Sequence, residues 1–147
     1  MGEILNYLRG IAKEFKEQVD QGKRYIVVID AGKIREVAAK IKELGSETYL
    51  ATISAVDLIE EGTIQLNYCF WSQEEKALIV LRVNLPRDSP RIETISDIIP
   101  GARNAEAEAY DVMGVYFEGN QSLKRSFLVP EEVVKQGIFP LRKDFKG

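Results

Sequence analysis

The stretch TIQLNYCFW, residues 63–71, decides the fold, because apolar and mixed side chains alternate along it. One set of alternate positions is uniformly large and apolar: Ile64, Leu66, Tyr68 and Phe70. The other set is more polar: Gln65, Asn67, Cys69 and Trp71. A period of two with unlike faces is typical of a strand that is covered on one side only. The stretch therefore predicts a sheet with helices on one of its faces.

Two more strand-like stretches flank this one. ETYLATISAVDLI precedes it at residues 47–59, and KALIVLRVNL follows it at residues 76–85. The separators EEG and SQEE are short and charged, as expected of turns in an antiparallel meander. We therefore expect three strands linked by hairpins.

The first third of the chain combines helical stripes with one strand. Residues 3–20 carry apolar side chains at steps of three and four, which predicts an amphipathic helix stopped by Gly22. RYIVVI, residues 24–29, predicts a short buried strand. A second helical stripe follows from Ile34 to Leu44, with Asp30 near its start and Gly45 at its end. Strand and helix together predict a β-α unit.

The last third begins with DSPRIETISDIIPG, residues 88–101, which predicts a short helical connector between two proline breaks. A further helix is expected from about Ala102 to Met113, stopped by Gly114. Residues 115–147 show no sustained periodicity but keep five aromatic residues, so we expect an extended segment that lies against another surface.

These elements predict an α+β fold with a mixed β-sheet packed by helices, in the order α-β-α-β-β-β-α. The chain of 147 residues, 45% of them hydrophobic, is sized for one domain. Within it we expect a globular core at residues 1–114 and an extended docking arm at residues 115–147.

Composition argues against several classes of function. A formal net charge of −3 gives no general attraction to nucleic acid or to anionic membranes. One cysteine and no histidine leave no ligand set for zinc or an iron–sulfur cluster, so we expect no cofactor on this chain. The longest apolar runs, YIVVI and ALIVL, are too short to cross a membrane, and the start does not read as an export signal.

Candidate catalytic groups are few. Cys69 lies in the middle of a predicted strand and would need a lysine or carboxylate as its base, so we favour a structural cysteine. DAGK, residues 30–33, resembles the end of a phosphate loop, but Val27 stands where that loop needs glycine. We therefore expect neither covalent catalysis nor nucleotide binding.

Charges gather in the last third of the chain. Helical spacing places Glu108 and Asp111 on one face, with Glu106 rotated away. Taken alone, these carboxylates indicate a solvated acidic face, with acid–base work or cation binding as alternatives. The doublets at 124–125 and 142–143 are basic and lie among aromatic residues. Arginine, aromatic side chains and opposite charges are typical of an interface, so the pattern favours a docking role.

The segment PRDSPRIETISDIIPGARNAEAEAYDVMGVYFEG at residues 86–119, with LKR at 123–125 and PLRKDF at 140–145, resembles a known family. It is similar to the thirty-kilodalton subunit (the C subunit) of respiratory NADH:quinone oxidoreductase (complex I) and to its counterpart in energy-converting membrane-bound hydrogenases. The resemblance implies partner docking at the matching positions, namely Glu106, Glu108, Asp111, Gly114, Phe117, Gly119, Leu123, Arg125, Pro140, Leu141, Arg142, Lys143, Asp144 and Phe145.

Four positions depart from the family pattern. Asn104 and Ala107 stand where the family helix carries Trp and Arg, while Asn120 and Phe139 replace two histidines. These departures favour a relative in a hydrogenase or similar membrane complex over a standard quinone-reducing enzyme.

The resemblance implies a non-redox structural subunit of a membrane-associated electron-transfer complex. Its expected partners are a large catalytic subunit, of the forty-nine-kilodalton or hydrogenase large-subunit type, and an iron–sulfur small subunit. Iron–sulfur clusters and a quinone site or nickel–iron centre would belong to those partners. The complex would lie on the cytoplasmic side of the cell membrane, with this chain peripheral. A small RNA-binding module and a stand-alone enzyme are the competing interpretations.

Overall fold

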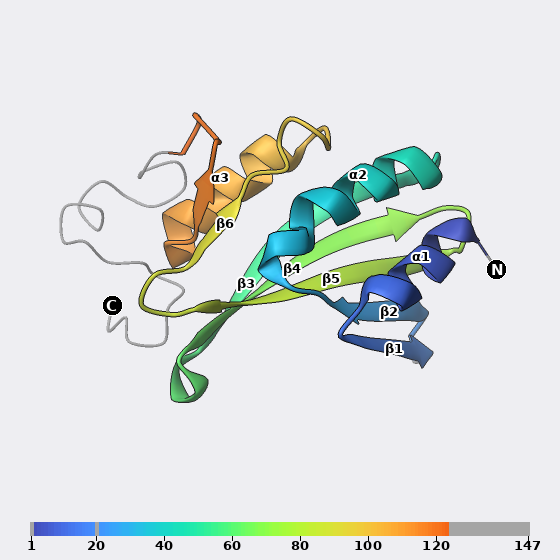
Figure 1. The fold of residues 1–147 in the computed structure, drawn as a ribbon, viewed down its shortest axis with the longest axis horizontal. Helices are drawn as coiled ribbons and strands as arrows, with labels where there is room; N and C mark the ends of the chain where they lie inside the picture. The colour runs from blue at the N-terminus through green and yellow to red at the C-terminus, as the bar shows by residue number, and fades with distance from the viewer. Residues whose placement is uncertain (1, 20, 124–147) are drawn as a thin grey trace.

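The computed structural model describes residues 2–19 and 21–123. Its main feature is a five-stranded sheet with the strand order β1-β2-β5-β4-β3 (Figure 1). Within this sheet only β2 and β5 pair in parallel, so the predicted mixed sheet and the meander β3-β4-β5 are confirmed. The strands are β1 (Glu14–Val19), β2 (Lys23–Val28), β3 (Thr48–Leu58), β4 (Thr63–Ser72) and β5 (Ala77–Pro86).

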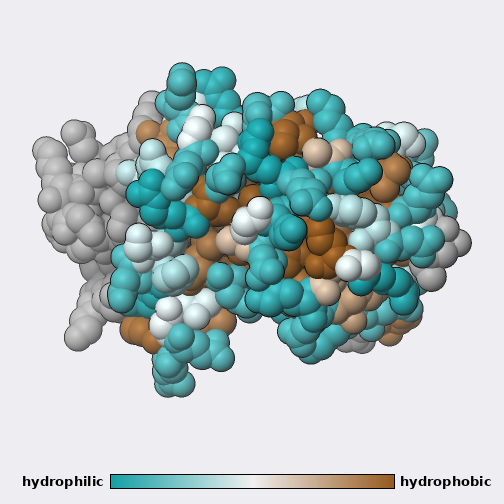
Figure 2. All heavy atoms as spheres, viewed as in Figure 1, coloured by the Kyte–Doolittle hydropathy of each residue, from teal (hydrophilic) through white to brown (hydrophobic). Residues whose placement is uncertain are grey.

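Three α-helices share one core with the sheet: α1 (Glu3–Ile11), α2 (Ile34–Leu44) and α3 (Ala102–Met113). Short 3-10 turns lie at Ala31–Lys33 and Ile59–Glu61. Buried side chains from all three helices join the inward positions of β4, where Ile64, Leu66, Tyr68 and Phe70 are fully buried. The alternate residues Gln65, Cys69 and Trp71 are only half-buried, which confirms the unlike faces at these positions. Asn67 is buried, and its side-chain oxygen accepts a hydrogen bond from Arg82. The side of the molecule shown in Figure 2 is mostly hydrophilic with apolar patches near its centre.

The first helix is shorter than expected. It ends at Ile11, and residues 14–19 form the edge strand β1 instead of continuing the helix. Six residues of β1 pair with β2, and Phe15 turns inward to meet the ring of Tyr25 at 5.7 Å. The helical stripe at residues 3–20 was therefore a wrong prediction beyond Ile11, because pairing with β2 satisfies this backbone in the extended form.

The connector at residues 88–101 is also not helical. It contains the short strand β6 (Arg91–Glu93), which pairs parallel with β7 (Tyr116–Glu118). Ile92 and Phe117 lie opposite each other in this pair, and both are buried. The described order is therefore α1-β1-β2-α2-β3-β4-β5-β6-α3-β7, longer than the predicted order by β1, β6 and β7.

The last helix has the predicted bounds, and glycines flank it. Gly101 and Gly114 adopt φ values of +90° and +81°, a region that favours glycine, so the chain turns sharply at both ends of α3. Val115 and Phe117 then return to the core. The first residues of the expected arm thus pack against the body, while residues 124–147 lie outside the described part.

One-sided coverage of the sheet predicts unequal costs for two neighbours in β4. Phe70→Ala should lower the free energy of unfolding by about 3–5 kcal/mol, because it leaves a cavity in the core. Trp71→Ala, on the other face, should cost less than half as much, since that ring is already half-exposed. Urea unfolding of the two variants gives the comparison. Equal costs would mean that both faces of the sheet are covered.

Candidate docking site around Glu106

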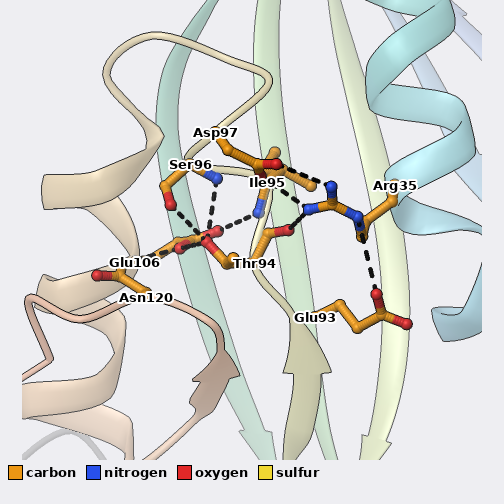
Figure 3. Close-up of polar contacts among 8 residues, drawn as sticks. All are labelled: Arg35, Glu93, Thr94, Ile95, Ser96, Asp97, Glu106 and Asn120. Carbon is orange, nitrogen blue, oxygen red and sulfur yellow. Dashed lines mark hydrogen bonds and ion pairs between the residues drawn. The ribbon is translucent and has the colours of Figure 1, made fainter.

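Glu106 on α3 is fully buried and holds three segments of the chain together. One carboxylate oxygen accepts hydrogen bonds from the Thr94 hydroxyl at 2.5 Å and from the Asn120 side-chain amide at 2.9 Å. The other oxygen accepts from the backbone N–H of Ile95 at 2.9 Å. Ser96 completes this group, the Glu106 cluster, because its backbone N–H donates to the Thr94 hydroxyl oxygen at 3.0 Å (Figure 3). The cluster connects α3 with the segments that follow β6 and β7.

The turn after β7 is shaped to reach the carboxylate. Gly119 has φ +96°, and a Cβ at this position would lie 2.9 Å from the Thr94 methyl group. The glycine therefore allows both the left-handed backbone and the close approach to Thr94. Asn120 is fixed from both ends, since its amide also donates to the Arg103 carbonyl at 3.2 Å and its oxygen accepts from the Ser122 N–H at 2.8 Å.

Arg35 ties α2 to the same segment. Its guanidinium donates to the Thr94 carbonyl at 2.6 Å and to both carboxylate oxygens of Asp97 at 2.8 Å, and it lies 3.7 Å from Glu93 (Figure 3). The hydrogen bond from Arg35 lowers the pKa of Asp97 to about 2. Asp97 is exposed, so the pair adds little stability and acts mainly on geometry.

Burial sets the electrostatics of Glu106. Loss of solvent raises the pKa of this carboxyl above 4.5, although its three hydrogen bonds act in the opposite direction. Tyr68 lies fully buried on the inward face of β4, and its hydroxyl has no hydrogen-bond partner among the described residues. Burial, and then the charge of Glu106, raise the pKa of Tyr68 well above its usual range. A carboxylate enclosed in this way is suited to fixing segments, since it has no open side for a substrate.

The structure rearranges the predicted acidic face. Glu106 and Asp111 are buried and Glu108 is exposed, so the expectation that Glu108 and Asp111 share a solvated face was wrong. The reason is that α3 packs on β3 along one side and meets the β6 and β7 segments along another, which encloses most of its circumference.

The remaining predicted docking residues divide into two groups. Gly114 ends α3, Phe117 is buried, Gly119 is exposed and Leu123 is half-buried. The others lie outside the described residues: Arg125, Pro140, Leu141, Arg142, Lys143, Asp144 and Phe145.

Several contributors to the site were missed in the sequence. They are Arg35, Thr94, Ile95, Ser96, Asp97 and Asn120. Two signals were available. The run TISD, residues 94–97, is typical of a turn in which Thr, Ser and Asp side chains form hydrogen bonds with nearby backbone groups. Asn120 stands at a histidine position of the family motif, where an amide also donates hydrogen bonds.

The metal-ligating and thiol side chains of the described residues bear on the sequence expectations. Among them, no group of three or more His, Cys, Asp or Glu side chains is placed to hold a metal ion. Cys69 is a half-buried thiol on the outward face of β4, and burial raises its pKa, which disfavours the reactive thiolate. In this same part of the chain, no helix has the length and apolar character to span a membrane.

Removing the carboxylate separates the roles of the two glutamates on α3. Glu106→Ala should lower the free energy of unfolding by about 3 kcal/mol, because three buried donors lose their acceptor. The matched control Glu108→Ala changes the same residue type at an exposed position of the same helix and should stay within about 0.5 kcal/mol. Chemical unfolding near neutral pH measures both. Similar losses from the two variants would contradict the cluster.

The raised pKa of Glu106 also predicts a pH dependence. The folded chain holds this proton more tightly than the unfolded chain, so stability should fall as pH rises from about 4.5 through the raised pKa, and then level off. The side chain of Glu106→Gln does not titrate, so the free energy of unfolding of this variant should lack the decline, even where the substitution changes that free energy by a constant amount at every pH. The difference in unfolding free energy between the two proteins, followed from pH 4 to 8, isolates the effect. A difference that is flat or of opposite slope would refute it.

Comparison with known proteins places the chain in a family. A family model described as "Respiratory-chain NADH dehydrogenase, 30 Kd subunit" matches residues 27–147. The C subunit of the NADH-quinone oxidoreductase of Moorella thermoacetica is 36% identical over 82% of this chain and 78% of its own length. The C subunit of the F420H2 dehydrogenase of Methanosarcina mazei is 30% identical over 81% and 73%. The beta subunit of the membrane-bound hydrogenase of Pyrococcus furiosus is 30% identical over 84% and 71%.

Solved structures show the same relationship. A chain of the archaeal membrane-bound sulfane sulfur reductase, a respiratory membrane complex, matches with a TM-score of 0.80 and 31% identity, covering 98% of this chain and 84% of that one. A trypsin-resistant fragment of Nqo5 matches with a TM-score of 0.65 and 25% identity, covering 82% and 96%. Sequence and fold agree with the resemblance seen in residues 86–145, and this chain belongs to the family of the 30 Kd subunit of respiratory-chain NADH dehydrogenase.

Proposed function

We propose that this chain is a structural subunit, without a redox centre of its own, of a membrane-associated electron-transfer complex. The observation that carries the proposal is its membership in a family whose named relatives serve different reactions. They are subunits of an NADH-quinone oxidoreductase, an F420H2 dehydrogenase and a membrane-bound hydrogenase. A subunit kept while the electron donor and acceptor change is better suited to holding the complex together than to a particular reaction.

The Glu106 cluster supports this role through rigidity. It fixes α3 and the turn after β7, so the last described residues before Lys124 are held in a defined position. The segment beyond begins with Lys124 and Arg125 and ends with PLRKDF at residues 140–145. In our proposal, Arg125, Arg142 and Lys143 pair with carboxylates or backbone carbonyls of a partner. Hydrogen bonds from charged donors are strong where the interface partly excludes water.

The proposed partners are a large catalytic subunit and an iron–sulfur small subunit. In this arrangement the iron–sulfur clusters and a quinone site or nickel–iron centre belong to those subunits, and electrons pass beside this chain. The chain reaches the membrane only through its partners, on the cytoplasmic side. The relatives of known name include both quinone-linked and hydrogenase-type complexes, so both acceptor classes stay within the proposal.

Truncation tests the docking role. A tagged chain that ends after Pro130 should keep a cooperative unfolding transition, because the Glu106 cluster and the sheet lie before the cut. It should fail to co-purify the large subunit from cells, whereas the tagged full chain should bring it down. Mass spectrometry of the recovered large subunit also shows whether it carries the paired CxxC motifs of a nickel site.

The control is the full chain with Glu108→Ala, which alters only an exposed carboxylate of α3. Recovery of the large subunit at full yield with the truncated chain would contradict the proposed arm. Recovery of the full chain alone, without any partner subunit, would contradict the proposed function as a whole.

A further inference from the structure

The outward side of the sheet carries an unusual row of side chains. Strand register places Gln18, Arg24, Leu78, Trp71 and Tyr49 next to one another across all five strands. We call the outward positions of β1 to β5 the open face, since all three described helices pack into the core on the other side. Tyr49, at the edge strand, is 59% exposed, and the rings and aliphatic groups beside it are only half-buried. A strip of large side chains is therefore available at the surface.

Positive charge borders this strip. The charged side chains of the open face are the cations Lys16, Arg24 and Arg82 and one carboxylate, Glu14. None of the three cations makes an ion pair within the described residues; Arg82 donates only to the Asn67 amide oxygen at 2.9 Å. This excess stands out in a chain whose net charge is −3.

Two of these cations act on the thiol of Cys69, which lies on the same face. Burial raises the pKa of its thiol, while the charges of Arg24 and Arg82 act to lower it. No carboxylate opposes them at this position. Arg24 lies next to Leu78 in the strand register, and Arg82 lies opposite Asn67, so the two cations stand at different points of the open face.

The composition of the row points to protein recognition. Trp, Tyr and Arg are the residues most enriched among interface positions that carry binding energy. A second copy of this chain is a poor occupant, because a symmetric contact through this face would set cations against cations. A protein surface with an apolar centre and flanking carboxylates complements both the rings and the charges.

The row lies at the end of the sheet that is near the N-terminus. The N–H of Gly2 donates to Glu75 in the β4–β5 turn at 3.0 Å, which places the N-terminus beside the end of the sheet that carries the row. In Figure 1 this end lies opposite α3, after which the described chain ends. The row is therefore separated from α3 by the length of the sheet.

We propose that an acidic surface of a second subunit of the same complex docks on the row formed by Arg24, Leu78, Trp71 and Tyr49. This inference rests on the proposed function. The chain then bridges two neighbours, one through its C-terminal segment and one through its open face. The apolar strip supplies the buried centre of this contact, and Arg24 and Arg82 fix its register against carboxylates.

Charge reversal in the intact complex tests this inference. Arg24→Glu should reduce retention of the chain in the salt-washed complex by about tenfold or more, because it sets a carboxylate against carboxylates. Lys42→Glu is the matched control, since Lys42 is an exposed cation on α2, a helix that packs into the core on the other side of the sheet. Both positions are at the surface, and unfolding midpoints of the isolated variants should equal that of the parent chain.

Photo-cross-linking identifies the occupant. A benzoylphenylalanine at position 49 should cross-link to one other subunit, at a peptide rich in Asp and Glu, and the same probe at position 42 should not. The inference fails, and the proposed function stands, if the chain remains in the complex but the probe at position 49 cross-links to no other subunit, capturing nothing, RNA or only a second copy of the chain. The same holds if the Arg24→Glu variant is retained in the complex as well as the parent chain. If the parent chain joins no complex, both fail.

Discussion

A buried carboxylate constrains the second half of this protein. Glu106 has no contact with solvent, so the free energy of burying it must be offset by hydrogen bonds from the chain itself. Its donors come from positions 94, 95 and 120, which lie 11 to 14 residues away from Glu106 on either side of it in the sequence. The fold can satisfy this carboxylate only when β6, α3 and the turn after β7 lie together. Arg35 extends the same constraint to α2 through its hydrogen bonds to Thr94 and Asp97.

The sheet divides the molecule into a side that makes the core and a side that is free for other contacts. Inward positions of β4 and β5 are closed by the helices, and their burial accounts for the hydrophobic contribution to stability. The outward positions keep aromatic rings, cations and one thiol at or near the surface. A protein built this way can present two surfaces, the region around α3 and the open face.

Sequence alone determined much of this architecture. The alternation in residues 63–71 assigned the two faces of β4, because a period of two in a strand leaves no other arrangement. Helices α2 and α3 were bounded correctly, since Gly45, Gly101 and Gly114 mark where a helix must stop or turn. The motif in residues 86–145 identified the family, and the match of the family model to residues 27–147 confirms it.

Only the tertiary structure decided the rest. Residues 14–19 fit a helical stripe as well as an edge strand, and pairing with β2 selected the strand. Glu106 and Glu108 look alike in the sequence, yet one is buried and the other exposed, because burial depends on where α3 meets β3 and β6. The row from Arg24 to Tyr49 is likewise invisible before strand order is known. Local propensity acts over a few residues, whereas these outcomes depend on which distant segments become neighbours.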